Sequence, residues 1–285
     1  MSNLVPGDRV FHPSKKEWGV GKVLGVTPDQ VDVFFVAAGN KRLSRQYVTL
    51  ERAEGDAARH SLLDNLTVGI AQSSSEFLTF PAAIQKFVRA YPGGFDGPRF
   101  LAEERNYKVK AHQLCVQLLG EQEVMDLVEE QKYTEICDRA RKVEAGTNLL
   151  ASFEKIKFNE ALKHPDVQKS FAEGLVDLLY GCETEEMRFS RFVTMLDRFG
   201  IAKWPVATYF GYIRFPSSRI FIKPEVTQLA ASLCGWEIGY RSEPNWRTYG
   251  AVLGLFNYMR DELIKPEMPP RDMIDVQSFI WCSAQ

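Results

Sequence analysis

The stretch "LVPGDRVFHPSKKEWGVGKVLGV", residues 4–26, decides the fold of the N-terminal part of the chain. Valines and other β-forming residues alternate here with glycines and prolines, and apolar residues do not recur at helical spacing. Short runs of β-formers bounded by glycine and proline are typical of strands. The chain therefore begins with strands rather than with a helix.

The following stretch, "QVDVFFVAAGNKRLSRQYVTL", residues 30–50, continues this pattern. Val31, Val33 and Phe35 form one face of a predicted strand, and Gly39-Asn40 predicts a tight turn. The last predicted strand of this part contains Leu43, Tyr47 and Val48. Four or five such short strands bury a core only if the sheet curls, which the glycines permit, so we expect a small barrel over residues 1–52.

Beyond the barrel the apolar spacing becomes helical. Residues 53–75 are predicted as a linker and first helix, and residues 76–285 as an all-α domain with a subdivision near residue 181. Ser75 is expected to cap a helix that carries Phe77 and Phe80. Apolar steps of three and four residues from 136 to 156 predict one long helix. Later helices are expected at 187–199, 206–213, 226–233, 246–263 and from 270 or 271 onwards, and Gly181 is expected to end the helix before them.

The composition describes an ordinary globular chain of one to three domains. Of its 285 residues, 45% are hydrophobic and 25% are charged. A formal net charge of −2 argues against a surface coated with nucleic-acid-binding charge but leaves room for a local basic face. The cysteines lack the spacing of a disulfide framework or a zinc site: Cys115, Cys137, Cys182, Cys234 and Cys282. With no signal segment and no apolar run of membrane length, we expect a cytoplasmic protein without metal or cofactor.

Three short patterns in the first fifty residues carry a resemblance to a known family. These patterns are G-D-x-V-x-H-P at 7–13, W-G-x-G-x-V at 18–23 and G-x-K-x-L at 39–43. They resemble the Tudor-like barrel appended to UvrD/PcrA-type helicases and, more distantly, the RNA-polymerase-interacting domain of CarD and of transcription–repair coupling factor. The resemblance implies a binding module that grips RNA polymerase, another protein or nucleic acid. The predicted fold class is therefore α+β and multidomain: a small Tudor/SH3-like barrel followed by a large all-α domain.

The predicted barrel has a positive charge balance. Seven basic and four acidic residues in its first fifty positions give a net charge of +3. A cationic face of this size could neutralise a few phosphates and give salt-sensitive binding. The predicted nucleic-acid-binding residues of this part are Lys22, Lys41, Arg42 and Arg45. Trp18 is either an anchor for a protein partner or a plug for the open end of the barrel.

A second resemblance lies in "MLDRFGIAKWPVATYFGYIRFPSSRIFIKPEVTQLAA", residues 195–231. It is similar to the helix-hairpin-helix of base-excision DNA glycosylases, and "RDMIDVQSFIW" at 271–281 resembles the closing helix of some oxoguanine-type members. In such a hairpin, a glycine-rich turn lets backbone N–H groups approach a DNA phosphate. The predicted phosphate-facing residues of the body are Gly200, Lys203, Arg214, Arg219 and Lys223.

The departures from the glycosylase pattern concern the chemistry itself. Trp204 takes the position of the lysine nucleophile of bifunctional members, and Ala202 replaces the second hairpin glycine. Lys223 takes the place of the aspartate that stabilises a cationic transition state. No catalytic residue is therefore assigned.

Two charged clusters are further candidate sites. "AEERNYKVKAHQ", residues 102–113, holds carboxylates that could serve as acid and base, but the sequence favours a solvated face or an internal Glu–Arg pair. Asp272 and Asp275 lie at i, i+3 near a predicted helix start, where carboxylates cap the helix and complement its dipole. Trp281 is interpreted as a core residue.

The sequence favours a non-enzymatic adaptor associated with transcription or DNA repair. Its barrel would bind RNA polymerase, a repair helicase or DNA, and its helical body would make a second protein or DNA contact, so that the linked modules raise each other's effective concentration. One alternative is a glycosylase-like enzyme acting on DNA bases with a rearranged site. Another is the partner protein of a stress or phage-defence system.

Overall fold

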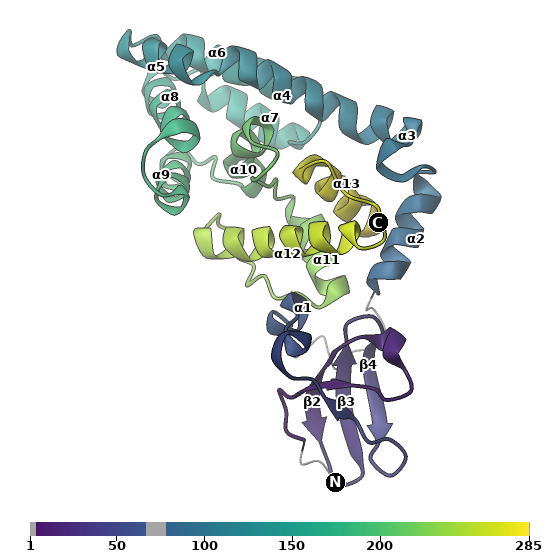
Figure 1. Cartoon of the computed structure of the whole chain (residues 1–285). Coiled ribbons are helices and arrows are strands. Elements are labelled where there is room, and N and C mark those ends of the chain that lie inside the picture. Colours follow the sequence, from purple (N-terminus) through teal and green to yellow (C-terminus); the bar gives the residue numbers. More distant parts are fainter. Residues whose placement is uncertain (1–3, 67–77, 285) are drawn as a thin grey trace. The chain divides into compact units, whose positions relative to one another are not determined.

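The computed structural model describes residues 4–66 and 78–284, and shows a small antiparallel sheet followed by a large helical domain (Figure 1). These residues group into two compact units. We call the described residues up to Ala90, with 228–238 and 282–284, the N-terminal unit, and residues 91–227 with 239–281 the helical unit. The predicted domain boundaries at 52, 75 and 181 stay predictions.

The N-terminal sheet contains five strands in the order β4-β3-β2-β1-β5. Their bounds are β1 Arg9–Phe11, β2 Gly21–Val26, β3 Gln30–Phe35, β4 Gly39–Ser44 and β5 Glu51–Arg52. One face covers a cluster of buried apolar residues: Leu4, Val10, Val23, Val31, Val33, Phe35 and Leu50. Alternation along β3 places these valines inward, as the sequence predicted, because successive side chains of a strand point to opposite faces.

Two local predictions in the sheet are wrong. Residues 36–38 make the turn before β4, and Gly39-Asn40 are the first pair of β4, with Gly39 opposite Phe35. Of the last predicted strand, Leu43 does lie in β4, whereas Tyr47 lies in a turn after β4 and is 83% exposed, and the two-residue strand β5 follows. The apolar residues of 30–50 do follow strand spacing, but the register is set by their pairing across the sheet.

The outer face of the sheet is also covered. Phe34, on β3, is 1% exposed, and Gly235 approaches both Phe34 and Leu66 within the same unit. An isolated bridge joins Leu66 to Trp236. The unit further contains the short helix α1 (Ser61–Asp64) and α2 (Phe80–Ala90). The predicted cap at Ser75 and the residue Phe77 lie outside the described residues.

The helical unit is built from amphipathic helices around one fully buried helix. Their bounds are α3 Pro98–Phe100, α4 Asn106–Leu118, α5 Glu121–Glu129, α6 Tyr133–Ala145, α7 Ser152–Ala161, α8 Pro165–Tyr180, α9 Glu185–Arg198, α10 Trp204–Arg214 and α12 Trp246–Ile264; α11 Pro224–Cys234 and α13 Met273–Ala284 begin in this unit. Every residue of 204–213 is buried, which makes α10 the centre of the unit. A helix that is apolar on all sides is typical of such a central position.

The predicted long helix from 136 to 156 is wrong, since it is two helices, α6 and α7. Thr147, in the connection, hydrogen-bonds the hydroxyl of Tyr209 on α10 at 3.0 Å, and its carbonyl accepts a bond from Lys155 at 2.6 Å. These contacts hold the chain in a bend that the apolar spacing does not reveal. Phe153, expected to be buried, is 62% exposed on α7. The other expected helices match α8 to α13 closely, and Gly181 does end α8.

Candidate functional site

Two of the four cations predicted to bind nucleic acid in the sheet are held by the N-terminal unit itself. The Lys22 ammonium donates to the carbonyl oxygen of Leu63 at 3.0 Å. Burial and the neighbouring Arg9 lower the pKa of Lys22. The Arg45 guanidinium donates to the carbonyl oxygen of Thr27 at 2.9 Å. These contacts connect strands and loops of the unit. They occupy donors of Lys22 and Arg45 that a phosphate would otherwise use.

The other two cations lie on the edge strand β4. Lys41 Nζ stands 5.5 Å from the ring centroid of Trp18, a cation–π distance. Arg42 forms an ion pair with Asp32 of β3, with Nε and Oδ1 2.7 Å apart, and its side chain is 69% exposed. An exposed pair of this kind is worth about 0–1 kcal/mol, so a phosphate can compete for the guanidinium.

Trp18 packs on the apolar cluster of the sheet. Its ring centroid lies 4.9 Å from that of His12 and 5.2 Å from that of Phe35. His12 is buried, and its Nδ1 accepts a hydrogen bond from the backbone N–H of Ser14 at 3.2 Å. Trp18 therefore closes one end of the apolar cluster, and its partly exposed ring and Lys41 together form the surface there.

Gly200 of the predicted hairpin ends helix α9. Its φ is +70°, and its N–H donates to the carbonyl of Asp197 while the N–H of Ile201 donates to that of Leu196. This pair of bonds is a Schellman motif, which requires the left-handed conformation that glycine adopts freely. Gly200 is therefore explained by the end of helix α9, and the hairpin that resembles the glycosylase motif stays a prediction.

Lys203 and Lys223 come together electrostatically around one acid. Glu154, on α7, is buried, and both lysines favour its ionised form. Burial is the larger effect and raises the pKa of the Glu154 carboxyl, whose Oε2 also accepts a bond from the N–H of Ala151 at 2.9 Å. Both lysines therefore act on the Glu154 carboxylate, and Lys203 also acts on Glu243.

Arg214 and Arg219 lie apart from this pair and carry internal bonds. Both guanidinium carbons stand 4.8 Å from the ring centroid of Phe215. Arg214 donates to the Tyr180 hydroxyl at 2.8 Å, and the buried Arg219 pairs with Glu185 at 2.9 Å. The four predicted body cations therefore do not form one patch.

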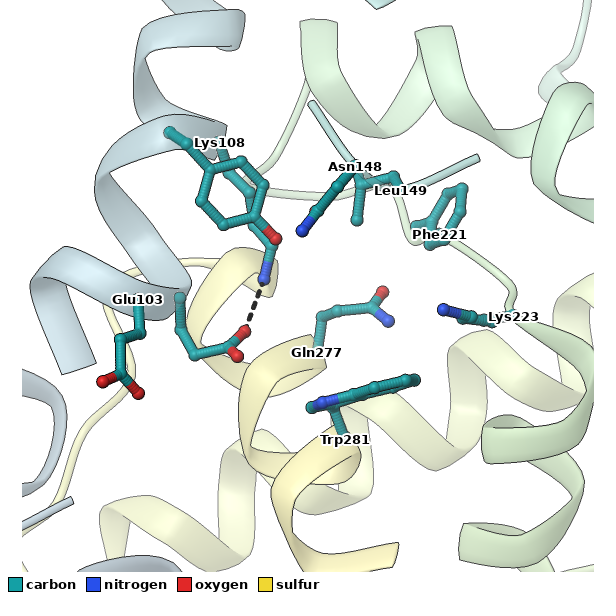
Figure 2. Close-up of a pocket in the computed structure, with 10 residues that line it drawn as sticks. Glu103, Lys108, Asn148, Leu149, Phe221, Lys223, Gln277 and Trp281 are labelled. Carbon is teal, nitrogen blue, oxygen red and sulfur yellow. Dashed lines mark hydrogen bonds and ion pairs between the residues drawn. The ribbon is translucent and has the colours of Figure 1, made fainter. Parts of the chain in front are cut away.

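The helical unit contains a cavity of about 120 Å³, and Lys223 is part of its wall (Figure 2). Its walls come from four separate parts of the chain: Glu103, Glu104, Tyr107 and Lys108; Asn148 and Leu149; Phe221 and Lys223; Gln277 and Trp281. Figure 2 shows Gln277 at the centre, above the ring of Trp281, with Lys223 reaching towards it from one side and Lys108 from the other. The lining of the cavity combines a few polar groups with apolar side chains, as is typical of small-molecule sites.

The Glu104–Lys108 pair forms one wall of the cavity. Residues Leu101–Arg105 form a π-helical turn just before α4, a distortion that is common at functional sites. Lys108, which is 2% exposed, donates to Glu104 Oε2 at 3.1 Å and to the Ser278 hydroxyl at 2.9 Å. Burial, followed by the nearby Glu104 charge, raises the pKa of the Tyr107 hydroxyl, which therefore stays protonated and able to donate. This wall offers both donors and an acceptor.

The opposite wall combines an amide, an aromatic ring and a cation. Gln277 is 5% exposed, and its Oε1 has no hydrogen-bond partner among the described residues. An unsatisfied buried polar group costs about 1–3 kcal/mol. Lys223 Nζ lies 4.4 Å from the centroid of the Trp281 ring. The cavity therefore carries an unused hydrogen-bonding group beside a flat apolar surface.

A network of ion pairs holds the helix α13, which carries Gln277 and Trp281, in place. Arg105 contacts Asp272 and Asp275, each at 2.8 Å, and Arg271 contacts Asp275 at 2.9 Å. Asp272 Oδ1 also accepts the N–H of Ile274 at 3.0 Å, which is the capping role expected of it. The network attaches α13, and with it Gln277 and Trp281, to the segment that carries Glu104 and Lys108.

Comparison with known proteins yields one match. Residues 4–53 match the model of DUF3553, described as a protein of unknown function. This segment coincides with the five-stranded sheet. No curated protein and no solved structure matches the chain.

Two features are absent from the part of the chain that the structure describes. From 4 to 66 and from 78 to 284, no helix is long and apolar enough to cross a membrane. Within the same ranges, no three His, Cys, Asp or Glu side chains come together as a metal site would require.

Sequence reasoning did not identify the cavity as a whole. It singled out Lys223 for a phosphate and the 102–113 cluster for its carboxylates, but it assigned Trp281 to the core and gave Gln277 no role. The spacing of Gln277 and Trp281, i and i+4, places them on one helix face and was the available signal. Asn148, in a connection between helices, carries no such signal.

Proposed function

We propose that the protein is a nucleic-acid-associated adaptor that breaks no bonds itself. Its N-terminal sheet would contact DNA, or RNA polymerase or a repair helicase acting on it, and its helical unit would make a second contact with nucleic acid. Since the two contacts lie on one chain, each raises the effective concentration of the other, so both can be individually weak. The Tudor-like character of the sheet is part of this proposal.

The observation that carries the proposal is the position of Lys223. It stands at the cavity wall, 4.4 Å from the centroid of the Trp281 ring, and acts together with Lys203 on Glu154. A cation there attracts a phosphate but opposes the cationic transition state of glycosidic bond cleavage. Residues of the segments that resemble the glycosylase hairpin and closing helix thus line one cavity, in which Lys223 takes the place of the family's aspartate.

In the sheet, Lys41 and Arg42 support a first contact. Both lie on the edge strand β4, with Lys41 on the side of Trp18 and Arg42 on the opposite side beside Asp32, where it forms only an exposed ion pair. We expect salt-sensitive binding of undamaged duplex or single-stranded DNA, measured by fluorescence anisotropy between 50 and 200 mM salt. Each lost phosphate contact lowers the slope of log K against log salt by about 0.9 for duplex DNA, so the double variant Lys41→Gln/Arg42→Gln should lower it by about 1.8.

The matched control removes two exposed lysines from the helical unit, Lys157→Gln/Lys163→Gln, and should leave the slope unchanged. Duplexes with oxidised, alkylated or deaminated bases should yield no abasic sites on incubation with the protein. Absence of salt-dependent DNA binding, together with absence of a polymerase or helicase in affinity purification, would contradict the adaptor proposal.

One observation favours an enzyme as a second candidate. The cavity holds an amine, Lys108, and a carboxylate, Glu104, next to each other. These are the two kinds of group that a rearranged base-excision site needs. Abasic-site formation that is lost in Lys108→Met would establish this candidate in place of the adaptor.

A further inference from the structure

We propose that the groove between helices α6 and α7 is a docking site for an acidic amphipathic helix of a partner protein. The groove lies in the helical unit and shares no lining residue with the cavity. The inference goes beyond the proposed function, because it concerns a protein partner and needs no nucleic acid. It rests on exposed apolar side chains at one end of the groove and on the pairing of the charges along it.

The two helices that form the groove run antiparallel to each other. Arg141 Nε on α6 donates to Asn159 Oδ1 on α7 at 3.0 Å, and Glu144 of α6 pairs with Lys155 of α7 at 3.0 Å. Residue numbers therefore rise along one wall as they fall along the other. Both helices contribute lining residues. A groove with helical walls is one of the recurring surfaces into which a partner lays the apolar face of an amphipathic helix.

The outer face of α7 is apolar at the end of the groove near the connection between the two helices. Phe153 and Ile156 are 62% and 63% exposed, the largest exposed fractions among the described large apolar side chains of the helical unit. They share a helix face with Glu160, which lines the groove, because positions i, i+3 and i+7 point the same way. An aromatic and an aliphatic side chain one turn apart are a typical anchor pair for a docked helix.

The charges of the groove favour an acidic occupant. Every carboxylate that lines it already pairs with a cation of the chain: Glu135 with Arg139, Asp138 with Arg141, Glu144 with Lys155 and Glu160 with Lys163. Lys142 lines the groove and Lys157 follows Ile156; both are exposed, and neither has an ion pair within the described parts of the chain. Lys142 acts on Glu135 at longer range, but Arg139 holds that carboxylate. A helix with carboxylates opposite the two lysines therefore gains two ion pairs and breaks none.

The same features disfavour a nucleic acid and a second copy of this chain as the occupant. A phosphate backbone would meet the four lining carboxylates, and it offers no apolar surface to Phe153 and Ile156. A two-fold contact presents the same surface from both copies. It would bring the unpaired lysines of both into one contact, where every carboxylate of the groove is already paired.

The test uses the full chain and three synthetic helical peptides of equal length. Each peptide carries two leucines at i, i+4 and, one turn further along the same face, two variable positions that hold glutamate, glutamine or lysine. In fluorescence anisotropy, the glutamate peptide should bind about tenfold more tightly than the glutamine peptide, and the lysine peptide should bind most weakly. Phe153→Ala/Ile156→Ala should weaken binding of the glutamate peptide about tenfold or more.

A charge reversal tests the assignment of the lysines. Lys142→Glu/Lys157→Glu should reverse the order of the peptides, so that the lysine peptide binds most tightly. The matched control, Met187→Ala/Lys110→Glu, changes an exposed apolar residue of α9 and an exposed lysine of α4, and should bind as the wild type does. Since all these side chains are exposed, each variant should keep the urea midpoint of the wild type, which separates lost binding from lost folding.

Three results would overturn the inference. The first is equal binding of the glutamate and lysine peptides, or an unchanged order in Lys142→Glu/Lys157→Glu. The second is a salt slope of duplex DNA binding that Lys142→Glu/Lys157→Glu lowers, which would make the groove a nucleic-acid surface. The third is self-association of the wild type that Phe153→Ala/Ile156→Ala abolishes, which would make it a contact between copies. The salt-slope test of Lys41 and Arg42 decides the proposed function separately.

Discussion

One ion pair of the N-terminal sheet and one of the helical unit differ sharply in their exposure to water. In the sheet, the Arg42–Asp32 pair lies on the surface, with side chains 69% and 40% exposed. In the helical unit, the Arg105 side chain is 12% exposed and its partner Asp275 is fully buried. Water screens the first pair and hardly reaches the second. The surface of the sheet is therefore available to a partner, whereas the buried charges of the helical unit fix the walls of a cavity.

The contrast between buried and exposed groups is largest for thiol chemistry. Burial raises the pKa of the Cys115, Cys137 and Cys234 thiols to about 12. Because only the thiolate reacts and its fraction falls tenfold for each unit by which the pKa exceeds the pH, these cysteines should react on the order of a thousandfold more slowly than an ordinary thiol at pH 8. The exposed Cys182 should react first.

Maleimide labelling at pH 8 followed by peptide mass spectrometry measures these rates, and Cys182→Ser provides the control in which the fast phase disappears. Fast labelling of Cys115 or Cys137 in the native protein would show that the helical unit is looser than its packing indicates.

The next largest effect is expected where a buried charge loses its partner. Asp275→Ala leaves the Arg105 guanidinium with one fewer carboxylate, and breaking a buried pair typically costs about 3–5 kcal/mol. Asp32→Ala in the sheet removes an exposed carboxylate with the same kind of partner and should cost at most about 1 kcal/mol. Urea unfolding followed by tryptophan fluorescence gives both values. Equal costs would remove the distinction between the two units.

A smaller effect is expected from crowding in the core of the sheet. An added Cβ at Gly21 would lie 2.7 Å from side-chain atoms of both Val33 and Phe35, so Gly21→Ala overpacks the apolar cluster and should cost about 1–3 kcal/mol. Gly25→Ala in the same strand is the matched control, since its nearest neighbour, an oxygen of Asp32, lies 3.9 Å away. The same unfolding measurement compares the two variants. A neutral Gly21→Ala would mean that the core of the sheet is not tightly packed.

The sequence by itself determined the elements whose causes are local. Alternating valines define β3 and Gly181 ends α8, because strand alternation and the end of a helix at a glycine need only neighbouring residues. The small sheet followed by a large helical domain follows from the same local patterns, since the period of the apolar residues changes once along the chain.

Only the tertiary structure decided the features that depend on distant residues. The break between α6 and α7 is held by Thr147 against Tyr209, and the outer face of the sheet is covered by residues near 235. The cavity brings together residues near 104, 148, 223 and 277, and neither the missing partner of Gln277 nor the position of Lys223 on Trp281 has a trace in any one segment. Burial and pairing are properties of the packed chain, because they depend on which segments exclude water from one another.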